Sequence, residues 1–258
     1  MCFHNKVVII SGAAGGIGKA TARLFANKGA RLVLVDLNAE RLEAIRDEFK
    51  LAAGRCLISV ADVTDEKAVG NYTEKTLEAF GTVDVVFNNA GIVGEANKVQ
   101  NFTAQSMQQV LQVNVMGVFY GMKYALRAMQ PRGQGVIINT GSISGVRGMP
   151  ETIAYCASKH AILGMTRCAA VENAGTGIRV CAVCPSPVST SMMTGIEESM
   201  AGMGCESQED VHRRLLGSIP MGRYARPDEV AKAVLFLASE DSSFISGSAI
   251  FVDGCFTA

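Results

Sequence analysis

The stretch Lys6-Val-Val-Ile-Ile-Ser-Gly-Ala-Ala-Gly-Gly-Ile-Gly18 sets the architecture of this 258-residue chain. Its first half is a β-branched run that is typical of a strand buried on both faces. A glycine-rich turn with the spacing G-x-x-x-G-x-G follows, and a helical pattern then continues through Lys28. This order brings backbone N–H groups and a helix N-terminus up to a pyrophosphate, although glycine turns also occur for purely structural reasons. The residues of this turn that we expect to bind a dinucleotide are Gly12, Gly15, Gly16, Ile17 and Gly18.

An acidic residue ends the next strand-like run. Ala30–Val35 is followed by Asp36, about 20 residues beyond the glycine turn, where a carboxylate accepts hydrogen bonds from the adenosine ribose hydroxyls. The same charge repels a 2′-phosphate, and Leu37 follows it rather than Arg or Lys. The sequence therefore favours NAD(H) over NADP(H). The alternative is that Asp36 and Asn38 only cap the next helix.

Further along the chain, strand and helix patterns alternate. This alternation predicts an α/β fold of the Rossmann-like, doubly wound kind, with a parallel sheet, helices on both faces and ligands at the strand ends. No repeat or linker interrupts it, so residues 1–258 are expected to form a single domain. The expected helices are Ala39–Lys50, Asp65–Phe80, Thr103–Met129 and Arg226–Leu237, and the expected strands are Arg55–Val60, Val83–Phe87, Gly135–Thr140, Ile178–Cys184 and Ser248–Val252.

Tyr155 and Lys159 lie four residues apart in a segment without Gly or Pro, so a helix would place them on one face. An ordinary tyrosine has a pKa of about 10, and a cation about 4 Å away contributes about 4 kcal/mol at an effective dielectric of about 20. Lys159 is therefore expected to lower the pKa of Tyr155 and make it a general acid/base near neutral pH. The alternative is an ordinary amphipathic helix with these two residues in register by chance.

Two further polar residues have addresses that suit the same chemistry. Asn114 lies inside a helical pattern, where it either kinks the helix and holds a water or is a satisfied structural side chain. Ser142 follows a strand directly, so its hydroxyl either donates to a carbonyl oxygen beside Tyr155 or belongs only to a Gly/Ser loop.

The composition excludes several classes of partner. The formal net charge is zero, which argues against nucleic acid, and no apolar run approaches a membrane span. The first residues lack the apolar core and cleavage site of a signal peptide, so we expect a cytoplasmic protein. Cys181 and Cys184 fall on opposite faces of an expected strand, and no metal site is predicted.

From about residue 186 to 222 the periodic pattern weakens and the segment becomes rich in Met, Gly and Ser. Methionine adapts to irregular apolar ligands, so this segment is predicted to be a mobile lid over the substrate. The alternative is that its methionines, among them Met192, Met193, Met200 and Met203, are plain core residues.

Taken together, these residues resemble the signature of the short-chain dehydrogenase/reductase family over essentially the whole chain. The resemblance implies a seven-stranded parallel sheet and a homotetramer, or sometimes a homodimer. Two positions depart from the family pattern, because Ser186 and Cys255 stand where glycine is usual. The matching motifs, in the order and approximate spacing of the family, are Ser11-Gly12-x-x-x-Gly16-x-Gly18, Asp62-Val63, Asn88-Asn89-Ala90-Gly91, Asn114, Ser142 and Tyr155-x-x-x-Lys159.

The resemblance also implies roles for individual residues. It casts Tyr155 as the catalytic acid/base, and Lys159 as the residue that lowers its pKa and binds the nicotinamide ribose. It implies that Ser142 positions the substrate oxygen and that Asn114 holds a water in a proton relay. Further implied cofactor contacts are Leu37, Asp62, Val63, Asn89, Ala90, Gly91, Pro185, Ser186, Val188 and Thr190.

The expected function is an NAD(H)-dependent oxidoreductase that interconverts a secondary alcohol and a ketone. The Gly94 region and the Gly145-Val-Arg-Gly148 segment are similar to bacterial cyclic-ketone (levodione-type) reductases. The alternatives are a 3-oxoacyl thioester (acyl carrier protein) reductase and a dinucleotide-binding protein without catalysis. A mainly apolar set of residues is expected to line a pocket for an apolar or cyclic substrate: Val93, Glu95, Ser144, Met149, Met192 and Met193.

Overall fold

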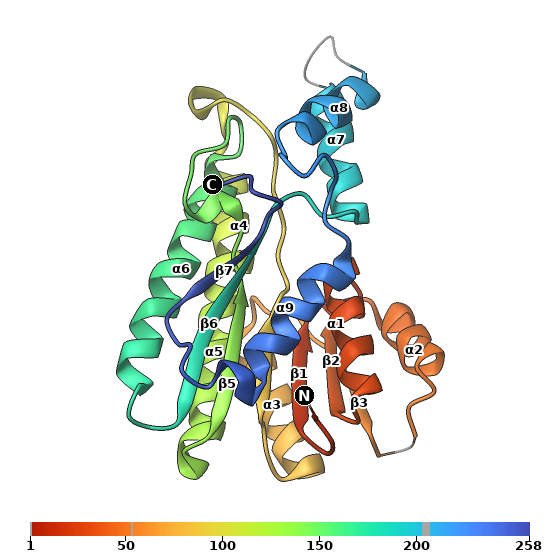
Figure 1. Cartoon of the computed structure of the whole chain (residues 1–258), viewed down its shortest axis with the longest axis vertical. Helices are drawn as coiled ribbons and strands as arrows, with labels where there is room; N and C mark the ends of the chain where they lie inside the picture. The colour runs from red at the N-terminus through yellow and green to blue at the C-terminus, as the bar shows by residue number, and fades with distance from the viewer. Residues whose placement is uncertain (1, 53, 203–206) are drawn as a thin grey trace.

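Across residues 2–52, 54–202 and 207–258, the part of the chain that the computed structural model describes, seven parallel strands form one sheet. The strand order is β3-β2-β1-β4-β5-β6-β7, and every neighbouring pair is parallel (Figure 1). The strands are β1 (Val7–Ser11), β2 (Arg31–Asp36), β3 (Cys56–Val60), β4 (Val85–Asn88), β5 (Gly135–Thr140), β6 (Ile178–Pro185) and β7 (Ala249–Val252).

Strand β1 is buried on both faces, as its β-branched run predicts. Its side chains alternate between two hydrophobic clusters, with Val8 and Ile10 in one and Val7 and Ile9 in the other. Because successive side chains of a strand point to opposite faces, both faces need a cover of helices.

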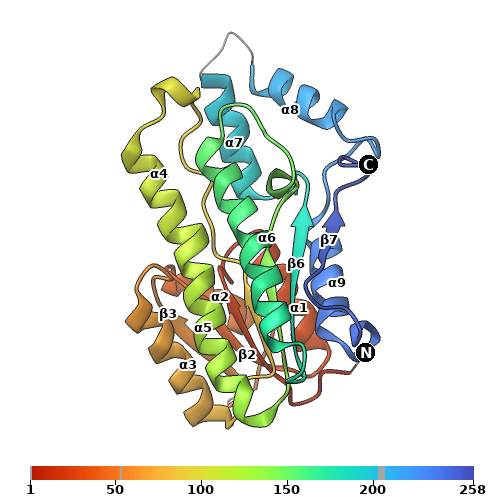
Figure 2. The same ribbon diagram turned by 90° about the vertical axis from the view of Figure 1, so that its left-hand side faces the viewer.

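The helices provide that cover in two layers (Figures 1 and 2). One cluster joins the sheet to α1, α2 and α9, and the other joins it to α3, α5 and α6. This arrangement confirms the predicted doubly wound α/β fold. The helices of these layers are α1 (Gly16–Asn27), α2 (Ala39–Glu48), α3 (Glu66–Phe80), α5 (Gly117–Met129), α6 (Ile153–Asn173) and α9 (Pro227–Ala238). Short 3-10 helices span Val99–Asn101, Gln130–Arg132, Ile143–Gly145 and Glu240–Ser242.

The strand order reverses at β1, which pairs with β2 on one side and with β4 on the other. In doubly wound sheets a ligand binds in the crevice at the carboxyl ends of the strands beside such a switch. The glycine turn follows β1, and Asn89 follows β4, so both predicted cofactor segments lie at this crevice. No helix in the described ranges is both long and apolar enough to cross a membrane.

The long helical pattern of Thr103–Met129 is not one continuous α-helix. It consists of α4 (Ala104–Leu111), a π-helical segment η2 (Gln112–Met116) and α5. The polar Asn114 lies at the centre of the π segment with its side chain fully buried. Single π turns inside α-helices are frequent at functional sites, and this one contains the residue that the sequence singled out.

The segment from residue 186 to 222 contains two helices that its weak pattern did not predict, α7 (Ser191–Gly202) and α8 (Gln208–Gly217). Residues 203–206 of the predicted lid, Met203 among them, lie outside the described residues. The helices pack mainly on each other rather than on the sheet. The buried carboxylate of Glu197 accepts hydrogen bonds from His212 Nδ1 and the Tyr224 hydroxyl, both at 2.7 Å. Their small core consists of Met193, Val211, Leu215, Ile219 and Tyr224.

Two helical glycines provide a test of how tightly the layers pack. A Cβ at Gly121 would lie 2.1 Å from Asn88 Oδ1, and Asn88 cannot withdraw freely because its Nδ2 donates to Asn139 Oδ1. We expect Gly121→Ala to lower the free energy of unfolding by roughly 1–3 kcal/mol, as measured by urea denaturation. The control Gly164→Ala, in open space on α6, should raise it by roughly 0.5–1 kcal/mol. Equal effects of the two substitutions would contradict the packing described here.

Candidate active site

Tyr155 and Lys159 lie on the same face of α6, against the end of β5. Lys159 is buried, and its Nζ donates a hydrogen bond of 2.8 Å to the carbonyl oxygen of Thr140, the last residue of β5. The same Nζ lies 5.3 Å from the centroid of the Tyr155 ring. The predicted helical register of the pair is therefore present, and the ammonium also ties α6 to the sheet.

Ser142 lies beside this pair. Its side chain is buried and caps the short helix Ile143–Gly145, with Oγ accepting from the backbone N–H of Ser144 at 3.1 Å. A hydrogen bond between Ser142 and the phenol of Tyr155 lowers the pKa of that tyrosine. The predicted juxtaposition of the two hydroxyls is thus found.

The pKa values differ from the sequence-based expectation. Burial raises the pKa of Tyr155 to about 12, and this effect outweighs the hydrogen bond from Ser142. Burial also lowers the pKa of Lys159 to about 8. The expected lowering of the tyrosine pKa by Lys159 is therefore not found in this structure. The distance argument neglected the loss of water around both groups, which disfavours both charged forms.

Asn114 is held by protein partners on all sides. Its Oδ1 accepts from the Ile92 N–H at 2.9 Å, and its Nδ2 donates to the Ile92 carbonyl at 2.8 Å and to Ser158 Oγ at 3.0 Å. The side chain therefore has all its hydrogen-bond donors paired, as expected for a structural asparagine. It also lies where the regular α-helix is interrupted, as expected for a residue that kinks the helix. A Cβ at Gly91 would lie 3.1 Å from Asn114 Oδ1 and 3.9 Å from Lys159 Nζ, so these groups converge.

The glycine turn has the shape that a pyrophosphate requires. Gly12 has a φ of +65°, and a Cβ on Gly18 would fall 2.1 Å from the Gly12 carbonyl oxygen. Helix α1 starts at Gly16, and among the described residues no side chain caps its N-terminus. The backbone N–H groups there, with the positive end of the helix dipole, suit an anion. The residues present therefore fit a dinucleotide.

Thr190, which is distant in sequence, packs against the glycine turn. A Cβ on Gly16 would lie 2.6 Å from Thr190 Cγ2, so the threonine packs directly on the turn. Its hydroxyl donates to the Val188 carbonyl at 3.2 Å, and Val188 forms a bridge to Ala225. Pro185 ends β6, and the N–H of the buried Ser186 donates to Val252 O at 3.2 Å.

Asp36 binds the glycine turn rather than the next helix. Its Oδ2 accepts from the Ala14 N–H at 3.0 Å and its Oδ1 from the Asn38 N–H at 3.2 Å. Asn38 alone caps α2, accepting from the Arg41 N–H. Leu37 beside it exposes 68% of its surface, an apolar side chain at the place expected for an adenosine. The carboxylate therefore holds the glycine turn, and the capping alternative applies only to Asn38.

The remaining predicted cofactor residues extend the same crevice. Asn89 Nδ2 donates to the carbonyl oxygens of Ser11 and Gly12, both at 3.2 Å, and thereby joins the end of β4 to the glycine turn. Ala90 also approaches Gly12, because a Cβ on Gly12 would lie 2.8 Å from Ala90 Cα. Asp62 follows β3 and accepts from the Thr64 N–H at 2.8 Å, and Val63 packs against Gly117.

The predicted substrate residues do not form one cluster. Met193 packs inside the core of α7 and α8, Met192 is exposed, and Ser144 is buried beside Ser142. Val93 is half-buried next to Ile92, and the carbonyl of Met149 accepts from Thr152 Oγ1 at 3.1 Å.

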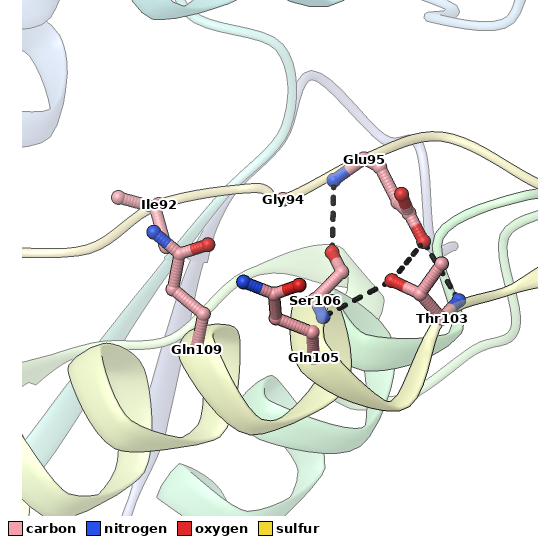
Figure 3. A pocket seen from close by; sticks show the side chains of 7 residues that line it. All are labelled: Ile92, Gly94, Glu95, Thr103, Gln105, Ser106 and Gln109. Atoms are coloured by element: carbon pink, nitrogen blue, oxygen red, sulfur yellow. Dashed lines mark hydrogen bonds between the residues drawn. The ribbon is translucent and has the colours of Figure 1, made fainter.

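Glu95 lies in a cavity of about 400 Å³ between residues 92–95 and the N-terminal half of α4 (Figure 3). Its Oε1 accepts from the N–H and the hydroxyl of Thr103, at 2.8 and 2.9 Å, so the carboxylate holds the loop. Gln105 and Gln109 also line the cavity, one helical turn apart. Exposed glutamines on a helix have no distinctive sequence pattern, so the sequence did not predict a role for them.

Cys181 and Cys184 lie on opposite faces of β6, as the strand pattern predicts. Cys181 and Cys184 are free and buried, and they pack in separate clusters on the two faces of β6. Within the described ranges, no group of three or more His, Cys, Asp or Glu side chains could hold a metal ion.

Known proteins match this chain over nearly its whole length. The family model described as enoyl-(acyl carrier protein) reductase matches residues 12–257. Levodione reductase from Leifsonia aquatica is 38% identical over 254 residues, which are 98% of this chain and 94% of that protein. Cyclohexanol dehydrogenase from Acinetobacter sp. (strain SE19) is 36% identical over 255 residues, with 99% and 96% covered. The chain belongs to the short-chain dehydrogenase/reductase family. The predicted family, and the prediction of an oxidoreductase of this family acting on alcohols and ketones, are thereby confirmed.

Solved structures agree with this short-chain dehydrogenase/reductase assignment. NAD+-bound xylitol dehydrogenase matches with a TM-score of 0.93 and 35% identity, covering 97% of this chain and 98% of that one. An actinorhodin polyketide ketoreductase variant with NADPH matches with a TM-score of 0.93 and 31% identity, covering 98% and 97%. A nicotinamide dinucleotide cofactor is thus a property of the family, in either its NAD or its NADP form.

The depressed pKa of Lys159 predicts a pH-dependent stability. Between about pH 8 and 10.5 the unfolded chain holds a proton on this lysine that the folded chain has lost, so the contribution of Lys159 to the free energy of unfolding rises with pH in this window. We expect the advantage of wild type over Lys159→Met to grow by roughly 3 kcal/mol across the window, as measured by urea denaturation. Lys232→Met, at an exposed lysine paired with Asp228, should leave the slope unchanged. A wild-type slope in Lys159→Met would refute the assignment.

Proposed function

We propose that this chain is an NAD(H)-dependent oxidoreductase that interconverts a secondary alcohol and a ketone on an apolar, cyclic substrate. The observation that carries the proposal is the convergence of Tyr155, Ser142 and Lys159 at the carboxyl end of β5, beside the glycine cradle. A bound nicotinamide dinucleotide would supply the hydride for reduction or accept it in oxidation.

The protein's own groups handle the proton. Because burial raises the pKa of Tyr155 to about 12, the phenol is protonated at neutral pH and can give its proton to a carbonyl oxygen. Ser142 donates a second hydrogen bond to the same oxygen and so orients the carbonyl. Lys159 keeps a positive charge next to the ring and favours the phenolate that remains. Alcohol oxidation is the reverse of this transfer.

Asn114 is assigned a positioning role in this reaction. Its amide clamps the backbone of Ile92, which follows Gly91 at the end of β4, while the π segment displaces the helix backbone around it. We retain a water-holding role for Asn114 as part of the proposal, since its Oδ1 accepts one hydrogen bond, from the Ile92 N–H, and has a second lone pair for a water.

The preference for NAD(H) rests on Asp36 and Leu37. A carboxylate at the end of β2, without a neighbouring cation in sequence, accepts ribose hydroxyls and repels a 2′-phosphate. The NAD+-bound xylitol dehydrogenase supports this choice, while the NADPH-bound ketoreductase shows that the fold alone does not determine it.

The substrate class rests on relatives and on the residue types that the sequence predicts for the pocket. One relative, cyclohexanol dehydrogenase, is named after a cyclic secondary alcohol. The residues that the sequence predicts for the substrate pocket are mainly apolar. We propose that the segment of α7 and α8 acts as a lid on this site. An acyl thioester substrate, the main alternative, finds no basic patch for a carrier in the sequence.

We also propose a homo-oligomer, a tetramer or a dimer. Large apolar side chains are exposed on two helices and on the edge strand, namely Phe119 on α5, Val171 on α6 and Phe251 on β7. Such exposure favours association with another copy of the chain. The cytoplasmic location rests on the sequence alone.

Turnover of Tyr155→Phe tests the chemistry. The purified protein should oxidise cyclohexanol with NAD+ and reduce cyclohexanone with NADH, both faster than it reduces an acetoacetyl thioester. Tyr155→Phe should lower kcat roughly 10²- to 10⁴-fold, because the proton donor is lost. NADH binding, followed by fluorescence titration, should be unchanged. A variant with near wild-type kcat would refute the assigned role of the tyrosine.

Cofactor preference tests the role of Asp36. Asp36→Ala should weaken NADH binding about tenfold or more, since charge-assisted hydrogen bonds to the ribose are lost, and should reduce the discrimination against NADPH. The control Asn38→Ala removes the cap of α2 and should cost about 1 kcal/mol of stability without changing cofactor preference. Dissociation constants for both dinucleotides provide the measurement, and an unchanged preference in Asp36→Ala would count against the role.

A further inference from the structure

Ser158 lies directly before Lys159 on α6, and its side chain is completely buried. Its hydroxyl donates to the carbonyl oxygen of Tyr155 at 2.7 Å, three residues earlier on the same helix. The Oγ of Ser158 also accepts a hydrogen bond of 3.0 Å from Asn114 Nδ2. One hydroxyl therefore contacts the backbone of the tyrosine and the side chain of the asparagine at once.

This contact continues into the segment after β4. Asn114 uses its other N–H on the Ile92 carbonyl, at 2.8 Å, and its oxygen on the Ile92 N–H, at 2.9 Å. The side chain of an asparagine has two N–H donors, and here both are used. Ile92, Asn114, Ser158 and Tyr155 thus form one hydrogen-bonded chain across three separate segments of the sequence.

The chain fixes the orientation of the Asn114 amide. Since Ile92 presents both a donor and an acceptor, Oδ1 must face its N–H and Nδ2 its carbonyl, which directs the second N–H of Nδ2 at Ser158. Removal of the serine hydroxyl would leave that N–H unpaired in a site closed to water. An unsatisfied buried donor loses its hydrogen bonds to water without replacement, so the amide would rotate or shift.

We infer that Ser158 is a positioning residue, which holds the helix of Tyr155 and Lys159 in register with the π segment of Asn114 and with the residues after β4. This inference rests on the proposed function, in which Tyr155 is the acid/base. Ser158 touches neither substrate nor cofactor in this role. It acts through the backbone of the tyrosine and the amide of the asparagine.

The chain also offers a matched control. Thr76 is completely buried on α3, and its hydroxyl donates to the carbonyl oxygen of Tyr72 at 2.7 Å, one turn earlier on its helix. In the described part of the chain, its hydroxyl forms no hydrogen bond with a residue placed in the site. Thr76→Ala therefore removes a similar buried hydroxyl from a helix of the same layer without breaking a hydrogen bond of the site.

The experiment measures kcat, KM for the ketone, the pH profile of alcohol oxidation and urea stability for Ser158→Ala, Ser158→Cys and Thr76→Ala. Displacement of a reacting group by about 1 Å costs up to about 100-fold in rate, so Ser158→Ala should lower kcat roughly ten- to a hundredfold with little change in KM. Its half-maximal rate of oxidation should move to higher pH, because the phenolate loses its place beside Ser142 and Lys159. Ser158→Cys, which keeps the volume and a weak donor, should lie between serine and alanine.

Thr76→Ala should lose stability but keep the wild-type kcat and pH profile. A wild-type kcat and pH profile in Ser158→Ala, or the same losses in Thr76→Ala, would overturn the inference. If Ser158→Ala does not fold, Ser158→Cys decides, and a wild-type pH profile in it overturns the inference equally. Tyr155→Phe, measured in parallel, separates the two proposals. Activity retained in Tyr155→Phe contradicts the proposed function, whereas an inactive Tyr155→Phe with an unaffected Ser158→Ala contradicts only the role of Ser158.

Discussion

The absence of space for a side chain at Gly12, Gly16 and Gly18 constrains the rest of the molecule. The backbone of this turn approaches itself and its neighbours so closely that a Cβ on Gly18 would meet Gly12 O at 2.1 Å. Three distant segments use this closeness, since Asn89, Asp36 and Thr190 all contact the turn. The ends of β1, β2, β4 and β6 are thereby brought to one crevice, with the N-terminus of α1 open toward it.

Burial has a comparable effect on the chemistry. Lys159 is buried and Tyr155 is half-buried, and burial raises the pKa of the tyrosine to about 12 and lowers that of the lysine to about 8. Both shifts favour the neutral form. A protonated phenol beside a lysine that still carries its charge at neutral pH is a combination suited to protonating a carbonyl oxygen, because the anion left behind has a cation next to it.

The sequence predicted the parts that depend on local pattern. The β-branched runs gave the strands, and the four-residue spacing placed Tyr155 and Lys159 on one face. It did not predict α7 and α8, because their apolar residues pack on each other and follow no sheet-facing period. The predicted lowering of the pKa of Tyr155 was wrong, because the distance between two side chains says nothing about their burial. Ser158 was passed over because a small residue inside a helix reveals its partners only in three dimensions.

The π segment at Gln112–Met116 has a consequence for how this protein can change by insertion and deletion. A π turn holds one residue more than an α turn, and each residue turns a helix by about 100°. Loss of one residue there would restore a regular helix but rotate everything beyond it, so Val118 and Met122 would leave the sheet. The π segment thus changes the rotation of α5 relative to α4. As a result, α4 can face the loop at one end while α5 faces the core at the other.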